Sequence, residues 1–278
     1  MSAIARRRLV ALLAMAAVAI AVWLVVRGGS TDQRGASVEE ITIESEAVGR
    51  SLPVSVVTPE DAPEDAPLLV FLHGRDGNED SALVDEMFAA LDDLGDRAPV
   101  VAFPYGDEAS YWHDRADGAW GKYVLEEVIP QAAEAAGADP GRVAVGGISM
   151  GGYGAYSLAA EAPGRFCAVG GHAPAIWQTA GETAAGAFDD AEDFAEHNVI
   201  AAVEGQPEAF TRQPLWLDAG EDDPFVTGDD ALIAALEGAG TDLTARREPG
   251  GHTSDYWNSR WDEYLRFYAR ALAACDRA

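Results

Sequence analysis

The chain has 278 residues, of which 48% are hydrophobic and 9% aromatic, so it is long enough to bury one sizeable core. A formal net charge of −28 argues against a nucleic-acid partner, because binding to phosphates needs a basic surface and the 19 Lys and Arg residues form no long cluster. One domain of the size of an enzyme is therefore expected.

The N-terminal segment combines a basic start with an apolar run. Three arginines, Arg6–Arg8, precede an uncharged apolar stretch of 18 residues, Leu9–Val26. As a helix this stretch would extend about 27 Å and nearly span a bilayer. The positive charge keeps this end in the cytoplasm and places the rest of the chain outside. We predict a signal-anchor over residues 1–29, with a cleaved signal peptide and a secreted product as the alternative.

Small and polar residues follow the apolar run. Residues 30–37 read as a flexible tether, and the folded domain is expected over residues 38–278, without internal repeats. The chain is thus predicted to be exported and anchored in the cell membrane through its N-terminal helix, with the domain outside.

From residue 40 onward, strand patterns alternate with helix patterns. Strands are predicted at 40–47, 50–59, 66–74, 98–106, 142–147, 165–175, 214–223 and 242–252. Helices are predicted at 80–94, 120–136, 151–162, 229–240 and 255–275. This alternation indicates an α/β fold, with a mainly parallel sheet covered by helices on both faces and the first two strands as an antiparallel edge.

A glycine-rich turn surrounds Ser149. The stretch "RVAVGG" predicts a strand, "ISMGG" a turn and "YGAYSLAAEAP" a helix, so a G-x-S-x-G motif lies on the strand–turn–helix that a nucleophile elbow needs. A turn that exposes the serine oxygen leaves no room for a β-carbon at Gly147 or Gly151, and Ser149 must adopt a strained backbone. Helix packing alone would explain Gly152 and Gly154. Ser149 is therefore the predicted nucleophile.

A serine hydroxyl needs a base to take its proton, and the base needs an acid to orient it. In folds that carry the serine on such a strand–turn–helix, the three residues follow along the chain in the order Ser, then Asp or Glu, then His. His252 follows the last predicted strand on a glycine-flanked loop, and it is the predicted base. The other histidines fit less well: His73, His113 and His172 come too early or at the wrong strand ends, and His197 lies in an acidic helical stretch that suggests a surface role.

The acid is expected in the loop after the strand "LWLDAG". Asp223 is the predicted acid, and its neighbour Asp222 is an alternative that the residues alone leave open. Asp218 lies within the strand itself and is a less suitable choice.

The tetrahedral intermediate of such a reaction needs two amide donors. The predicted donors are the N–H groups of Met150, directly after the nucleophile, and of Arg75, in the loop after the third strand. Tyr111, Trp112 and Trp120 are candidate pocket residues, although packing in the core would explain them equally well. Residues 176–213 exceed a minimal crossover and are a candidate cap over the site.

Other chemistry finds little support in the sequence. It contains no H-E-x-x-H, His-x-His or paired cysteine motif, so no metal site is predicted, and no G-x-G-x-x-G follows the early strands, so no cofactor is predicted either. The acidic stretch 189–196 could bind a cation, but in so acidic a chain a solvated helix face is the favoured interpretation. Cys167 and Cys275 could form a disulfide in an exported protein, but the sequence leaves this open.

Several of these motifs together resemble one family. The stretches "GISMGGYGAYSLAAEAPGRF", "LHG", "VLEEVIPQ", "GEDDPF" and "PGGHTSDYW" look like those of the Putative esterase family, a branch of the α/β-hydrolases that includes esterase D, feruloyl and acetyl esterases, and actinobacterial mycolyltransferases. The resemblance runs from residue 68 to the C-terminus. It implies an α/β-hydrolase fold in which Ser149 is the nucleophile, Asp223 the acid and His252 the base, and so favours Asp223 over Asp222.

The predicted export separates this chain from the cytoplasmic S-formylglutathione hydrolases of that family and argues against a glutathione thioester as substrate. We expect an exported serine carboxylic-ester hydrolase that acts on a small ester through an acyl-enzyme. One alternative is a mycolyltransferase-like acyltransferase of the cell envelope, in which a sugar or lipid hydroxyl replaces water. The other is a catalytically idle envelope binding protein with the same fold.

Overall fold

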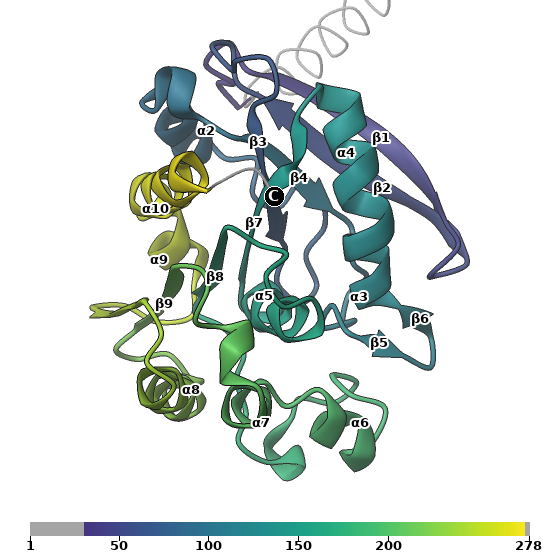
Figure 1. Cartoon of the computed structure of the whole chain (residues 1–278), viewed down its shortest axis with the longest axis vertical. Coiled ribbons are helices and arrows are strands. Elements are labelled where there is room, and N and C mark those ends of the chain that lie inside the picture. The colour runs from purple at the N-terminus through teal and green to yellow at the C-terminus, as the bar shows by residue number, and fades with distance from the viewer. Residues whose placement is uncertain (1–30, 276–278) are drawn as a thin grey trace, which may run out of the picture. The chain divides into compact units, whose positions relative to one another are not determined.

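A computed structural model describes residues 31–275 of the chain (Figure 1), so the predicted signal-anchor at residues 1–29 lies outside the described residues. In residues 31–275 no helix has the length and apolar character needed to cross a membrane. Residues 33–275 pack as one compact unit. Part of the predicted tether, 30–37, belongs to this unit: the Ala36 amide donates to the Gln33 carbonyl over 2.9 Å, and the Ala36 side chain is buried.

The centre of the described structure is an eight-stranded sheet with the order β1-β2-β4-β3-β7-β8-β9-β10 (Figure 1). Its strands are β1 (Ser37–Ser45), β2 (Arg50–Thr58), β3 (Pro67–Leu72), β4 (Val100–Pro104), β7 (Asp139–Ile148), β8 (Ala168–His172), β9 (Leu215–Gly220) and β10 (Leu243–Glu248). β1 pairs antiparallel with β2, β2 pairs antiparallel with β4, and the remaining neighbours are parallel. The predicted α/β class and its antiparallel edge are confirmed. A short hairpin of β5 (Asp114–Arg115) and β6 (Gly118–Ala119) was not predicted.

Helices cover both faces of this sheet. The α-helices are α2 (Asp85–Asp92), α3 (Trp120–Lys122), α4 (Ile129–Ala136), α5 (Met150–Glu161), α6 (Ala191–Glu196), α7 (Val199–Gly205), α8 (Val226–Gly238), α9 (Ser254–Asn258) and α10 (Trp261–Ala274). Three short 3₁₀ turns lie at Gly95–Arg97, Ala180–Glu182 and Pro207–Ala209. Figure 1 shows α2 and α10 together on one side of the sheet, with α4 and α5 on the other.

Side chains of the central strands alternate between two cores. In β3, Leu68, Val70 and Leu72 join the cluster that contacts α4 and α5, whereas Leu69 and Phe71 join the cluster that contacts α2 and α10. All five are at most 1% exposed. Burial of each such side chain stabilises the fold by about 1.5–3 kcal/mol. A strand buried on both faces explains why this stretch is continuously apolar in the sequence.

Two predicted helices are interrupted. The helix expected over 120–136 contains a π-helical segment, Tyr123–Val128, because Pro130 has no amide hydrogen to donate to the carbonyl four residues earlier. The helix expected over 255–275 is split into α9 and α10. The carbonyl of Tyr256 there accepts hydrogen bonds from Ser259 Oγ at 2.9 Å and Arg260 Nη1 at 2.7 Å, and these polar side chains end the first helix.

Cys167 and Cys275 form a disulfide, which the sequence left open. Cys167 precedes β8 and Cys275 follows α10, and their Cα atoms lie 5.6 Å apart. The bond ties the end of the chain's last described helix to the amino end of a central strand. Ser149, in contrast, follows the carboxyl end of the neighbouring strand β7.

Candidate active site

Ser149 lies on a sharp turn between β7 and α5. Its backbone has φ 56° and ψ −113°, a conformation that side chains other than glycine rarely adopt. A β-carbon at Gly147 would lie 2.4 Å from the carbonyl carbon of Gly151, and one at Gly151 would lie 2.0 Å from the carbonyl oxygen of Leu72. Both contacts are with backbone that cannot move aside. The tight turn therefore requires glycine at both positions, as the sequence predicted.

The structure joins Ser149, His252 and Asp223 by hydrogen bonds. His252 Nε2 lies 2.8 Å from Ser149 Oγ, and His252 Nδ1 lies 2.8 Å from Asp223 Oδ2. An ionised carboxylate can only accept a hydrogen bond, so the ring proton belongs on Nδ1. Nε2 is then the acceptor that faces the serine hydroxyl. This arrangement is the one in which an imidazole can remove a proton from Ser149.

The two neighbouring aspartates have different environments. The Asp223 side chain is fully buried, and its second oxygen, Oδ1, accepts a hydrogen bond from the amide of Phe225 over 2.9 Å. Asp222 is exposed, and its amide donates to the carbonyl of Gly250 over 2.9 Å. Of the two candidates that the residues alone left open, Asp223 is therefore the one that contacts His252.

Two glycines let the loop of His252 approach β9. A β-carbon at Gly220, the last residue of β9, would lie 2.3 Å from the carbonyl oxygen of Gly250. Gly250 itself has φ +132°, and a β-carbon there would lie 2.8 Å from Cδ2 of Tyr256. This close backbone contact brings His252 to the loop that carries Asp223.

The two predicted amide donors both belong to backbone beside Ser149. Met150 is the first residue of α5, and the first amides of a helix have no acceptor within the helix. Arg75 lines the same cavity as Ser149. The backbone of its loop runs close to the serine, since a β-carbon at Gly74 would lie 3.4 Å from Ser149 Cβ. The guanidinium Nη1 of Arg75 donates to the carbonyl of Ala185 over 3.0 Å.

His73 holds this loop in place. It is 6% exposed, its Nδ1 lies 2.7 Å from the Gly74 carbonyl oxygen, and its Nε2 accepts from the Gly106 amide over 2.9 Å. Burial lowers the pKa of His73 from 6.5 to about 4. The ring is therefore neutral at pH 7, as required for Nε2 to accept a hydrogen bond while Nδ1 donates one.

A cavity of about 500 Å³ opens over Ser149 and His252. Its aromatic lining residues are Phe71, Phe103, Tyr111, Phe225, Trp257 and Trp261. The predicted cap, residues 176–213, contains α6 and α7 and contributes Ala184 to the lining. Cavities of this size and apolar character bind small organic molecules.

The structure does not bring the predicted pocket residues Trp112 and Trp120 to this cavity. Both are at most 1% exposed and lie in the core. Trp112 Nε1 donates to the carbonyl of His73 over 3.2 Å, and its ring fills the space that the absent side chains of Gly106 and Gly154 leave. Core packing thus explains both tryptophans, whereas Tyr111, the third pocket candidate, lines the cavity.

A buried polar network below the site centres on Asp218, which is 1% exposed. Its Oδ1 accepts from Trp216 Nε1 at 2.7 Å and lies 2.8 Å from His172 Nδ1. Its Oδ2 accepts from the hydroxyls of Tyr256 and Tyr264, both at 2.9 Å. Burial by itself raises the pKa of Asp218, but hydrogen bonding and electrostatic attraction from His172, followed by the other donors, hold that pKa below its usual value.

This network touches the segments of both Ser149 and His252. The carbonyl of His172 accepts from the Ser149 amide over 3.0 Å, and Tyr256 lies four residues after His252 in the sequence. The sequence indicated only that Asp218 is a less suitable acid than Asp223 and did not predict this network. Three of its four partners come from β8, α9 and α10, and no local motif marks such a meeting.

The fold, the strained serine and its hydrogen-bonded histidine define an α/β-hydrolase. The chain belongs to the family described as "Putative esterase", which matches residues 45–268. This match confirms the predicted family.

Individual relatives are more distant. The chain is 30% identical over 181 residues to the MPT51 antigen of Mycobacterium leprae (strain TN), a match that covers 60% of this chain and only 54% of that relative. Among solved structures, a ferulic acid esterase has a TM-score of 0.75 at 21% identity, covering 85% of this chain and 99% of that one. An S-formylglutathione hydrolase from Agrobacterium tumefaciens has a TM-score of 0.74 at 21% identity, with 88% and 98% covered. At these identities the solved structures establish a shared fold.

Proposed function

We propose that this protein is an exported serine esterase that hydrolyses small carboxylic esters through an acyl-enzyme. The observation that carries the proposal is the unbroken pair of 2.8 Å hydrogen bonds from Ser149 through His252 to Asp223, beside a cavity of about 500 Å³. The catalytic residues would be Ser149 as nucleophile, His252 as base and Asp223 as acid.

In the first half of the reaction, Ser149 Oγ attacks the ester carbonyl carbon while its proton passes to His252 Nε2. Asp223 accepts from Nδ1–H and stabilises the positive charge that develops on the ring. The negative oxygen of the tetrahedral intermediate accepts hydrogen bonds from the amides of Met150 and Arg75. The intermediate collapses when the C–O bond to the alcohol breaks and His252 returns the proton to the leaving oxygen.

In the second half, water takes the place of the alcohol. His252 Nε2 removes a proton from water, whose oxygen attacks the acyl-enzyme carbonyl, and the same proton then returns to Ser149 Oγ as the acid leaves. The aromatic lining favours esters whose acyl or alcohol part is apolar, because little charge is available in the cavity to bind an anionic group. Among the residues that line this cavity, Arg75 carries a cationic side chain, and its guanidinium already donates to the carbonyl of Ala185.

Two features support the proposal that the protein is exported. The basic residues and apolar run at the N-terminus have the order of an export signal, and a disulfide such as Cys167–Cys275 persists in oxidising compartments. Anchoring by the apolar run is proposed over cleavage. Sequencing of the mature N-terminus tests this point, because a chain that begins near Ser30 has lost the anchor and is secreted.

Labelling with a fluorophosphonate probe and a panel of esters with varied acyl groups test the catalytic proposal. Wild type is expected to react with the probe and to hydrolyse esters, and Ser149→Ala to do neither. Ser157→Ala removes another hydroxyl from the same helix and should keep both properties. Equal turnover by wild type and Ser149→Ala would overturn the proposal, and an unlabelled, inactive wild type would indicate an idle binding protein. If an added alcohol is acylated in preference to water, the enzyme is instead an acyltransferase.

A further inference from the structure

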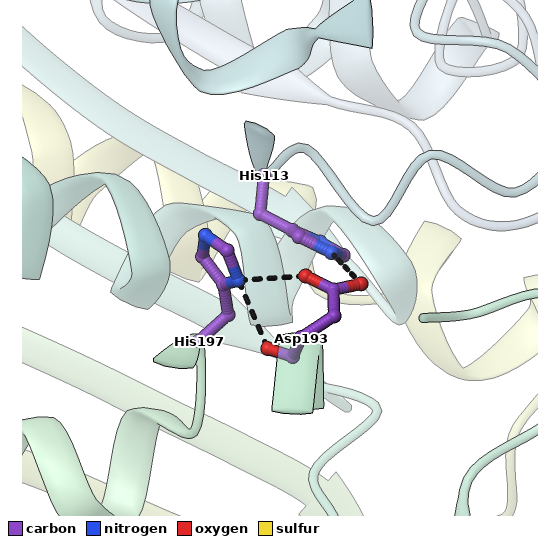
Figure 2. Close-up of side chains that lie close together, drawn as sticks. All are labelled: His113, Asp193 and His197. Atoms are coloured by element: carbon purple, nitrogen blue, oxygen red, sulfur yellow. Dashed lines mark hydrogen bonds and ion pairs between the residues drawn. The ribbon is translucent and has the colours of Figure 1, made fainter. Parts of the chain in front are cut away.

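His113, Asp193 and His197 form a second cluster of ionisable side chains, outside the cavity that contains Ser149 (Figure 2). The carboxylate of Asp193 faces both rings: its Oδ2 lies 3.2 Å from His113 Nε2, and its Oδ1 lies 2.9 Å from His197 Nδ1. We propose that these three side chains bind one divalent transition-metal ion, for which Zn²⁺ is the best match.

The donor atoms fit zinc in type and spacing. One ligand atom from each residue, two imidazole nitrogens and a carboxylate oxygen, can be chosen so that all lie within 4.8 Å of one another. Zinc binds such atoms at about 2.0–2.2 Å, so the ligands of a tetrahedral ion lie roughly 3.3–3.6 Å apart. The cluster therefore needs only a small contraction to close around the ion. Magnesium and calcium prefer ligand sets made of oxygen alone, and two imidazoles favour zinc over them.

The ligands are already oriented by their surroundings. The His113 side chain is fully buried, and its ring stacks on Phe188 with 4.9 Å between ring centroids. Asp193 Oδ2 also accepts from the amide of Asp189 over 2.7 Å. His113 Nδ1 has no hydrogen-bond partner among the described residues, so it can take the ring proton when Nε2 binds the ion. Ligands held by packing and by outer hydrogen bonds bind metal without first having to be ordered.

A cavity of about 320 Å³ gives access to the cluster. His197 lines it together with Asp114, Glu161 and Glu196, and the His197 side chain is 24% exposed. Three carboxylates around one cavity create a negative potential that attracts cations. The cavity also provides room for a water molecule as the fourth ligand of a tetrahedral ion.

The metal would connect two segments that are far apart in the sequence. Asp193 and His197 are four residues apart along α6 and its C-cap, whereas His113 directly precedes β5. This separation explains why no metal motif was found in the sequence. An ion bound only by the folded state adds to stability, so Zn²⁺ should raise the midpoint of thermal unfolding.

The proposal is tested by metal titration of the full-length protein in excess Ca²⁺, which occupies the many surface carboxylates of this acidic chain. Competition with a chromophoric chelator should show one tightly bound Zn²⁺ per chain. Co²⁺ at the same site should show the visible absorption of a four-coordinate ion with nitrogen ligands. Ser149→Ala should bind both ions as wild type does, because the proposed site does not depend on esterase activity.

Variants identify the ligands. Asp193→Asn and His197→Gln should each weaken Zn²⁺ binding by at least about tenfold and remove the thermal shift. Glu192→Gln removes one charge from the same helix, one residue before Asp193, and should bind like wild type. The Asp193 side chain is 12% exposed and that of His197 24%, so His197→Gln serves as the second variant if Asp193→Asn does not fold. The absence of a stoichiometric Zn²⁺ in wild type, or equal affinity in His197→Gln and Glu192→Gln, would overturn the assignment and leave a hydrogen-bonded cluster only.

Discussion

The hydroxyl of Tyr256 donates to Oδ2 of Asp218 over 2.9 Å, and this bond joins a buried carboxylate in β9 to the segment that carries His252. Tyr256 also packs against Gly250, two residues before His252. Tyr264 donates to the same oxygen over the same distance, but from α10. The two tyrosines therefore offer a matched pair, in which only one hydroxyl is connected to the loop of His252.

Tyr256→Phe is expected to lower kcat by roughly ten- to a hundredfold, because small displacements of a catalytic group have large effects on rate. KM should change little, since Tyr256 does not line the cavity beside Ser149. Tyr264→Phe should leave kcat nearly unchanged. Both variants should lose about 1–2 kcal/mol in free energy of unfolding, because each removes one buried hydrogen bond. Equal losses of kcat in the two variants would mean that the network contributes to stability only.

Substituting each of the two neighbouring aspartates in turn should show which one orients His252. Asp223→Asn is expected to lower kcat by roughly three to four orders of magnitude, because an amide at this position no longer holds the proton on His252 Nδ1. Asp222→Asn changes an exposed side chain and should retain activity. Ester hydrolysis by the two purified variants measures this directly. A larger loss in Asp222→Asn than in Asp223→Asn contradicts the assignment.

The turn at Ser149 should not tolerate a methyl group. Gly151→Ala places a β-carbon 2.0 Å from the Leu72 carbonyl oxygen and 2.8 Å from that of His73, so backbone must shift. A loss of about 3 kcal/mol or more in the free energy of unfolding is expected. Gly238→Ala, at the end of α8, meets no atom within 4 Å and should stay within about 1 kcal/mol of wild type. Urea unfolding of both variants checks the difference, and similar stabilities would contradict the steric argument.

His73 should make the protein less stable in weak acid. Its pKa is about 4 in the folded state against an ordinary 6.5, so the folded chain binds fewer protons than the unfolded chain between these values. The contribution of neutral His73 is fully present above pH 6.5 and is lost as the pH falls from 6.5 to 4. This pKa difference corresponds to about 3 kcal/mol in the free energy of unfolding.

His73→Gln keeps an acceptor for the Gly106 amide but does not titrate. The free energy of unfolding of wild type and His73→Gln, measured across this pH range, isolates the contribution of one histidine from that of the many carboxylates. The free energy of unfolding of wild type, relative to that of His73→Gln, should decrease as the pH falls from 6.5 to 4. A constant difference would mean that His73 is protonated in the folded state at the same pH as in the unfolded state.

Features that depend on local pattern could be predicted from the sequence. Leu68–Leu72 is apolar throughout because both faces of β3 are buried, and this periodicity is visible without a structure. The need for glycine at Gly147 and Gly151 follows from the sharp turn alone. Chain order then limited the base to His252, and the family resemblance limited the acid to Asp223. Local backbone preferences and burial patterns carry this information because they act over a few residues.

The contacts between side chains from distant segments, in contrast, follow from the tertiary structure. Trp112 and Tyr111 are neighbours, yet one fills the core and the other lines the cavity, because the space beside Gly106 and Gly154 accepts the larger ring. Distant segments are joined by the Cys167–Cys275 disulfide, by the hydrogen bonds of Asp218 to His172, Tyr256 and Tyr264, and by the approach of His113 to Asp193. Such contacts depend on how helices and strands pack across the whole domain, and no short stretch of sequence encodes that geometry.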